Sequence, residues 1–311
     1  MLIKTPGEPK EAHETRLLAT APPLLDMDAY VEEFGRSVVP AYRQGIADLE
    51  LPADAGLARS VIPPGTAATR DFSQLAPRIP ELVAERCVGC MACVNACPDT
   101  AILGTVIPLT QLDARIKAFA EGRPDPTRAA ATARGHFVDT QKYGEVPARR
   151  GLERGAFGIF VDPGHCKGCG ECVEVCAALG HDALFMIDKV ADESLAPAHG
   201  SVAPAAAVAD AALAASPVAP EDAAPALAGE STLDRFRRDM AFYRSLPPTP
   251  PEYRNEKALA DLMLGEFAFG YVGGAGSCAG CGEATAIRML VAATRQVHGP
   301  ESMGIVAATG C

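Results

Sequence analysis

Two runs of four cysteines constrain the fold of this chain more than any other feature of its 311 residues. Each run has the spacing C-x2-C-x2-C-x3-C, which is typical of chains that bind two [4Fe-4S] clusters. With this spacing, the first three cysteines of a run bind one cluster and the fourth binds the other. The sequence therefore predicts two clusters whose ligands come from both runs. The predicted ligands are Cys87, Cys90, Cys93 and Cys176 for the first cluster, and Cys97, Cys166, Cys169 and Cys172 for the second.

Zinc ions and disulfides are the alternatives for so many cysteines. Structural zinc prefers two C-x2-C knuckles from separate hairpins to four cysteines packed into one short run. A disulfide framework is disfavoured because the chain is long and its N-terminus lacks the apolar core of a secretory signal. Pro98 follows the first run, as is usual, whereas Ala177 takes the equivalent place after the second run. That change leaves every predicted ligand in place.

The net charge and the hydropathy of the chain restrict its expected partners and its expected location in the cell. Its formal net charge of -11 argues against nucleic acid and anionic membranes as partners. It has no uncharged apolar run of about 18 residues, the length that a membrane span needs. We therefore expect a cytoplasmic protein. Aromatic residues make up only 5% of the chain and tryptophan is absent, so we expect residues 79–190 to be largely unfolded without their clusters.

Residues 1–78 are predicted to be a helical connector. From Asp26 to Leu49, large apolar residues recur every three or four positions, as in an amphipathic helix. Pro40 predicts a kink or a break in this helix. We interpret it as a packing element without chemistry of its own.

Residues 79–191 are predicted to form an α+β, ferredoxin-like domain with two [4Fe-4S] clusters. Short helices are expected to begin near each fourth cysteine, which gives a β-α-β unit that is repeated once. The expected strands are Glu81–Glu85, Ala101–Ile107, Phe157–Val161 and Ala183–Val190.

An insertion separates the two cysteine runs. Its part from 111 to 154 carries nine basic and six acidic residues, within a chain that is acidic overall. We favour a solvated surface loop. The functional alternative is a docking patch, centred on Arg149, Arg150 and Arg154, that steers an acidic electron carrier towards a cluster.

Residues 192–230 are rich in alanine and proline, and this composition predicts a disordered linker. After the linker, Ser231 or Thr232 is expected to cap a helix that ends before the prolines from Pro247 to Pro251.

The remaining cysteines, Cys278, Cys281 and Cys311, form a third group near the C-terminus. A glycine-rich turn, 273–276, precedes them, and Glu283 opens a predicted amphipathic helix. The apolar run 303–308 predicts a buried strand, so the segment is typical of the start of an α/β domain. The C-x2-C pair alone fits a redox dithiol, half a zinc knuckle or half an iron–sulfur site. The eight upstream cysteines favour a third [4Fe-4S] cluster.

The segments Ser277-Cys278-Ala279-Gly280-Cys281-Gly282-Glu283 and Ala308-Thr309-Gly310-Cys311 resemble the pyruvate:ferredoxin (flavodoxin) oxidoreductases. These are 2-oxoacid:ferredoxin oxidoreductases that depend on thiamine diphosphate, and the resemblance also covers the two-cluster domain. It implies that 231–311 is the N-terminal part of a thiamine diphosphate-binding domain. It further implies that the three cysteines bind the cluster nearest the thiamine, with the fourth ligand further downstream, and that Glu283 lies close to the cofactor. A first-turn carboxylate favoured by the helix dipole is the simpler reading of Glu283.

Parts of the family pattern are missing from this chain. The magnesium and diphosphate-binding motif, G-D-G followed by asparagine, is absent because the sequence stops first, and the regions that bind pyruvate and coenzyme A are also missing. We therefore interpret the chain as an internal fragment that is not active alone.

The resemblance implies a reaction as well. The complete enzyme would oxidatively decarboxylate a 2-oxoacid, with pyruvate expected, to an acyl-coenzyme A. Electrons would leave the thiamine-bound intermediate through the [4Fe-4S] clusters and reach ferredoxin or flavodoxin. The full enzyme, which also holds magnesium, is expected to be a homodimer. The alternative is a non-catalytic polyferredoxin subunit that docks on a separate catalytic protein.

Overall fold

The computed structural model describes residues 27–44, 46, 49, 51, 71–73, 76–189, 230–255, 257–264, 271, 277–299, 302 and 303. The chain forms two compact units, Met1–Thr66 and Ala67–Cys311. Most of the Ala/Pro-rich linker, the glycine-rich turn, most of the predicted C-terminal strand and Cys311 lie outside the described residues.

In the described part of the first unit, α2 (Met27–Glu33), a π-helical turn η1 (Phe34–Val38) and α3 (Val39–Arg43) follow one another as a helical run. The predicted apolar stripe is confirmed for Tyr30, Phe34 and Val38, which are buried, whereas Leu49 is 86% exposed. The widened turn lies directly before Pro40. Because proline lacks the N–H that would continue the regular ladder, this irregularity confirms the prediction of a disturbed helix there.

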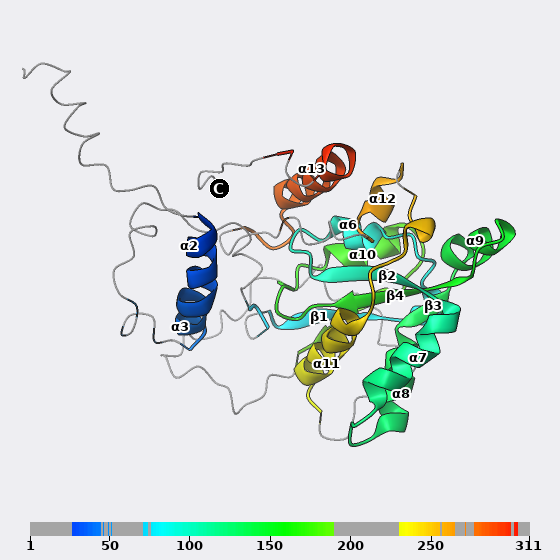
Figure 1. The fold of residues 1–311 in the computed structure, drawn as a ribbon, viewed down its shortest axis with the longest axis horizontal. Helices are drawn as coiled ribbons and strands as arrows, with labels where there is room; N and C mark the ends of the chain where they lie inside the picture. The colour runs from blue at the N-terminus through cyan, green and yellow to red at the C-terminus, as the bar shows by residue number, and fades with distance from the viewer. Residues whose placement is uncertain are drawn as a thin grey trace, which may run out of the picture. The chain divides into compact units, whose positions relative to one another are not determined.

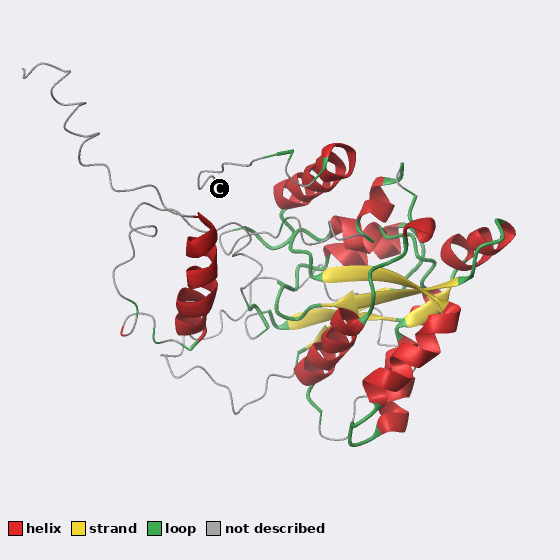
Figure 2. Ribbon diagram, viewed as in Figure 1, coloured by secondary structure: helices red, strands yellow, loops and turns green. Residues whose placement is uncertain are grey.

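Two antiparallel sheets organise the second unit (Figures 1 and 2). Strand β1 (Arg78–Leu82) pairs with β5 (Leu184–Asp188), and β4 (Gly155–Val161) lies between β2 (Ile102–Pro108) and β3 (Phe137–Asp139). Each sheet thus joins a strand from the first repeat to one from the second, which brings the two cysteine runs together.

All four predicted strands exist, although the first is displaced. We expected Glu81–Glu85, but β1 ends at Leu82 and the 3-10 turn η3 (Ala84–Arg86) follows it. The chain has to turn there to enter the first cysteine run.

The short helices also lie earlier than expected. Helix α6 (Ala92–Ala96) ends just before the fourth cysteine of its run, and α10 (Glu171–Ala178) contains both the third and the fourth cysteine of the second run. The prediction that each helix begins near the fourth cysteine is therefore wrong. One helical turn instead separates the third cysteine from the fourth.

The insertion between the runs is folded, so the interpretation as a solvated loop is wrong. It forms α7 (Leu109–Ala120), α8 (Pro126–Gly135), β3, a π-helical turn η4 (Gln141–Glu145) and α9 (Val146–Arg149). Leu112 and Ile116 of α7 are buried against Leu103 and Phe160 of the three-stranded sheet. This hydrophobic core is distinct from the one that contains the buried cysteines, and it includes no cysteine itself.

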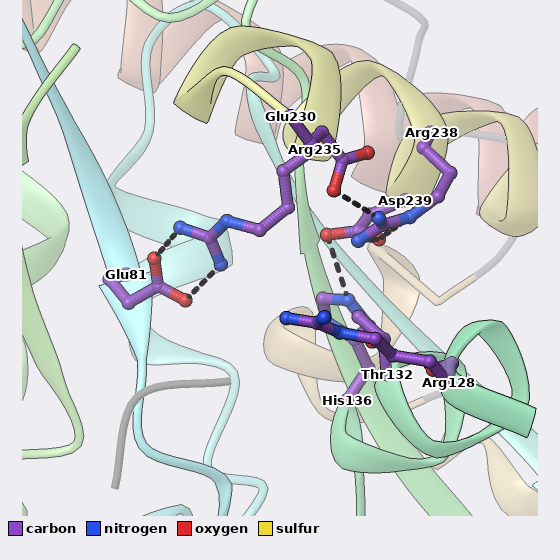
Figure 3. A network of polar contacts seen from close by, with 8 residues as sticks. All are labelled: Glu81, Arg128, Thr132, His136, Glu230, Arg235, Arg238 and Asp239. Atoms are coloured by element: carbon purple, nitrogen blue, oxygen red, sulfur yellow. Dashed lines mark hydrogen bonds and ion pairs between the residues drawn. The ribbon is translucent and has the colours of Figure 1, made fainter. Parts of the chain in front are cut away.

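Helix α11 (Thr232–Ser245) begins after Ser231, whose side chain accepts a hydrogen bond from the N–H of Asp234, as predicted. Arg235 of α11 forms a bidentate ion pair with Glu81 of β1, and both side chains are buried (Figure 3). Beside it, the Oδ2 atom of Asp239 lies 3.2 Å from His136 Nε2 at the end of α8. These contacts fix α11 on the two-cluster domain and on its insertion.

The chain continues through the 3-10 turn η6 (Pro251–Tyr253) and the short α12 (Leu259–Leu262) to α13 (Gly282–His298). Helix α13 packs on α6 and α12 (Figure 1).

Candidate iron–sulfur centres

The first cavity lies under the first cysteine run. Its walls include the four cysteines predicted for the first cluster, Cys87, Cys90, Cys93 and Cys176. The rest of the lining is largely apolar and includes Phe157 and Ile159 of β4. A bound group would therefore meet sulfur ligands inside an apolar wall.

The second cavity contains the other predicted set, Cys97, Cys166, Cys169 and Cys172. Its lining is more polar, because it also includes Asp99, Lys167 and Glu171. In both cavities, three cysteines come from one run and one from the other, which is the arrangement that the spacing predicted.

The placement of the thiols fits a cluster better than a single metal ion. Among the described side chains, no three Cys, His, Asp or Glu residues converge closely enough to bind one ion. Zinc would need its four sulfur atoms about 2.3 Å from one centre. The thiols instead line the wall of a cavity, as a cube with one cysteine on each iron atom requires.

Left-handed backbone shapes the loops at both cavities. Gly89 and Met91 of the first run have φ values of 72° and 69°, and Gly168 and Gly170 occupy the same positions of the second run with 71° and 86°. Successive residues in such turns direct backbone N–H groups towards one point, where an anionic group is stabilised. The same left-handed backbone conformation thus occurs at equivalent positions of both cysteine runs.

Burial makes the free thiols poor acids. It raises the pKa of Cys87 to about 11 and that of Cys166 to about 12. It also raises the pKa of Cys93 and Cys172 well above the ordinary value. Thiolates in these cavities therefore need a cationic centre to stabilise them, which bound iron provides.

Backbone N–H groups reach both fourth cysteines. Ala101 donates to Cys97 Sγ at 3.2 Å, and Ala183 donates to Cys176 Sγ at 3.3 Å. Both donors lie at the start of the next strand. Hydrogen bonds to ligand sulfur are among the features that set cluster potentials.

Two members of the third cysteine group, Cys278 and Cys281, lie at the rim of the second cavity. Lys167 donates to the carbonyl of Ser277, and a Cβ atom on Gly280 would come within 2.8 Å of Glu171 Oε1. Lys167 and Glu171 both line the second cavity. The Cys278–Cys281 segment is therefore held against the second predicted cluster site, while the place of Cys311 stays a prediction.

The buried face of helix α13 consists of two alanines and one arginine. Its buried residues are Ala284, Arg288 and Ala292, whereas Leu290 is 58% exposed and Val297 is 73% exposed. The small side chains of Ala284 and Ala292 allow α13 to approach α6 closely, while Leu290 and Val297 face outwards. We did not predict the burial of Arg288, and nothing in its sequence environment indicates it.

Glu283 lies in the first turn of α13 and is exposed. This position agrees both with a carboxylate favoured by the helix dipole and with a residue near a cofactor. Its proposed role near thiamine diphosphate stays a prediction.

The suggested basic docking patch is partly neutralised. Arg149 forms an ion pair with Glu145 at 2.9 Å, and Arg154 pairs with Asp139. Two of the three arginines of the patch therefore have a carboxylate partner, which weakens the case for carrier steering by this surface.

None of the helices in the described part of the chain is both long enough and apolar enough to cross a membrane.

Comparison with known proteins supports the iron–sulfur assignment. Residues 86–179 match the family model of the 4Fe-4S dicluster domain. The chain is also 29% identical over 176 residues to the probable pyruvate-flavodoxin oxidoreductase of Escherichia coli (strain K12). That alignment covers 56% of this chain but only 12% of the relative. No solved structure matches the chain. The chain thus contains a ferredoxin-type iron–sulfur domain and spans a small part of the relative's length.

Proposed function

We propose that this chain is the electron-transfer portion of a 2-oxoacid:ferredoxin or flavodoxin oxidoreductase. The proposal rests on one observation. Each of the two cavities is lined by four cysteines that come from both runs, and the Cys278–Cys281 pair lies at the rim of the second cavity. The similarity to a probable pyruvate-flavodoxin oxidoreductase supports the same reaction class.

Each cavity has its own set of four cysteines for one cluster. Cys87, Cys90, Cys93 and Cys176 hold one [4Fe-4S] cluster, and Cys97, Cys166, Cys169 and Cys172 hold the other. Bound clusters supply one-electron transfer chemistry. The protein contributes thiols, N–H donors to sulfur and a largely apolar lining around the first cavity.

The contacts of the third cysteine pair give the sites an order. Because Cys278 and Cys281 are held at the second cavity, we place this cavity between the third site and the first cavity in the proposed chain of centres. We assign Cys278, Cys281 and Cys311 to a third cluster nearest the thiamine diphosphate site of the complete enzyme.

The first cavity is the better candidate for the exit towards a carrier. Val88, which lines it, is 46% exposed, and Leu179, one turn after Cys176, is 51% exposed. Exposed apolar side chains beside a redox site suit brief contact with a small carrier protein. Ferredoxin or flavodoxin fits this role.

The second candidate function is that of an electron-transfer subunit without catalysis of its own. The outward apolar residues of α13, Leu290 and Val297, favour a partner surface there. A separate catalytic protein could cover these apolar residues, and so could further domains of the same polypeptide.

Iron and sulfide counts with EPR, under anaerobic conditions, test the cluster assignment. We expect about twelve irons per reconstituted chain, falling to about eight in the double variant Cys278→Ala, Cys281→Ala. About eight irons in both proteins would limit the chain to two clusters. Fewer than about four would contradict the proposal.

The reaction class needs a second experiment with the full-length protein. We expect the EPR signal of reduced clusters to appear when a 2-oxoacid and coenzyme A are added together. If the clusters reduce normally with dithionite but with none of a panel of 2-oxoacids, the subunit alternative is favoured.

A further inference from the structure

Arg288 is the largest fully buried side chain in the described part of the chain, with 1% of its surface exposed. Its Nη1 atom donates to the carbonyl oxygens of Val94 at 2.5 Å and of Cys97 at 2.9 Å. Helix α13 thus places a guanidinium directly on the backbone of a ligand of the second cavity.

Two further nitrogen atoms of this guanidinium, Nε and Nη2, are buried and make no hydrogen bond. No carboxylate among the described residues forms an ion pair with Arg288, so its contacts there are the two carbonyl oxygens. An isolated buried charge costs several kcal/mol or more unless a partner offsets it. The burial of this guanidinium and its two unpaired nitrogen atoms therefore favour an anion near Arg288.

We propose that Arg288 is the buried counter-charge of the cluster in the second cavity and raises the reduction potential of that cluster. The inference rests on the proposed function, because it needs a cluster held by Cys97 and its three partners. A [4Fe-4S] cube with four thiolates is anionic and becomes more so when it accepts one electron. A nearby cation stabilises the reduced form most, and burial strengthens the effect by lowering the dielectric.

The position of Arg288 links this potential to the third cysteine pair. Cys281 caps the N-terminus of α13, and Arg288 lies two turns further along the same helix. Thr285, between them, donates to the carbonyl of Ala96 at 3.2 Å. Because α13 packs on α6, it therefore places both Cys281 of the third site and the charge of Arg288 beside the second cavity.

The test is a potentiometric titration with dithionite, followed by EPR, on the reconstituted protein and on Arg288→Gln. Glutamine keeps a hydrogen-bond donor but removes the charge. We expect the reduced-to-oxidised ratio of the second cluster at a fixed potential to fall about tenfold, a shift of about 59 mV. The potential of the first cluster should not change.

Two matched variants separate charge from packing. Arg288→Lys keeps the charge and should restore most of the lost potential. Arg295→Gln removes the same charge about 10 Å further along α13 and should have a much smaller effect. An unchanged potential in Arg288→Gln would overturn the proposal, and so would equal shifts in the Gln and Lys variants, because packing would then explain them.

Iron counts keep this inference distinct from the proposed function. If the parent protein lacks clusters, the proposed function fails. If it holds them and only the potentials fail to respond, Arg288 is merely a structural donor to the end of α6. Loss of the second cluster from Arg288→Gln but not from Arg288→Lys would also support a charge role.

Discussion

The Nζ atom of Lys167 lies 2.6 Å from Ser277 Oγ and 3.0 Å from Asp99 Oδ1. A lysine between two predicted cluster ligands thus contacts both the residue after Pro98 and the residue before Cys278. The Lys167 and Asp99 side chains are almost fully buried. Lys167 is therefore one of the contacts that join the Cys278–Cys281 segment to the second cavity.

Removal of this lysine should loosen the C-terminal segment. In Lys167→Met, the buried carboxylate of Asp99 loses its cation, and breaking such a pair typically costs about 3–5 kcal/mol. We expect amides of residues 277–299 to exchange hydrogen faster, as measured by mass spectrometry on the reconstituted protein. Ser277→Ala is the matched control, because it loses a hydrogen bond worth about 1 kcal/mol and leaves the ion pair intact. Equal exchange in both variants would contradict this role.

The pair between Arg235 and Glu81 should matter more for stability than any surface pair. Glu81→Gln leaves the guanidinium buried without its carboxylate, so we expect a loss of about 3–5 kcal/mol in unfolding free energy. Glu145→Gln, which breaks the exposed pair with Arg149 on neighbouring helical turns, should cost well under 1 kcal/mol. Denaturant unfolding of the two reconstituted variants provides the measurement. Similar losses would mean that α11 does not depend on its buried ion pair.

The cysteine spacing predicted most of the candidate site. It fixes which residues lie one helical turn apart and which cross to the other run, and the two cavities contain those sets. The strands were predicted because β2 and β4 are continuous apolar runs. The short strand β1 mixes charged and apolar residues without alternation and lies at the entrance to a turn, so its signal is weaker and its boundaries were misplaced.

The features that were not predicted from the sequence depend on contacts between distant parts of the chain. The basic composition of the insertion suggested a loop, although Leu112 and Ile116 already have helical spacing. The buried face of α13 could not be read from hydrophobicity, because close packing on α6 selects alanines there. The burial of Arg288 depends on carbonyl groups about 190 residues earlier in the chain, and no local pattern encodes such a contact.

The core without cysteines leads us to revise the expectation that residues 79–190 unfold without metal. Leu103, Leu112 and Phe160 are buried together with Met240 and Phe242 of α11. When a chelator removes the iron, we expect α6, α10, β1 and β5 to lose hydrogen-exchange protection first. Helix α7 and the sheet around β4 should keep part of theirs, because apolar burial persists there. Simultaneous loss of protection in all these elements would show one cooperative unit.

Glycines in the second cysteine loop offer a test of its geometry. Gly168 and Gly170 both have positive φ, so alanine at either position is strained by about 1–2 kcal/mol. Only at Gly168 would the new Cβ also meet backbone, 2.8 Å from the carbonyl oxygen of Arg78, whereas nothing lies within 4 Å at Gly170. Because that contact is between the loop and β1, Gly168→Ala must displace Cys166 and Cys169 as well.

We therefore expect Gly168→Ala to lose the second cluster selectively, with about four fewer irons per chain and an unchanged EPR signal from the first cluster. Gly170→Ala shares the backbone strain but not the collision, so it should keep nearly all of its iron. If both variants lose the same amount, strain alone limits the loop and its approach to β1 is unimportant. If neither loses iron, cluster binding tolerates a shift of the loop that this structure does not allow.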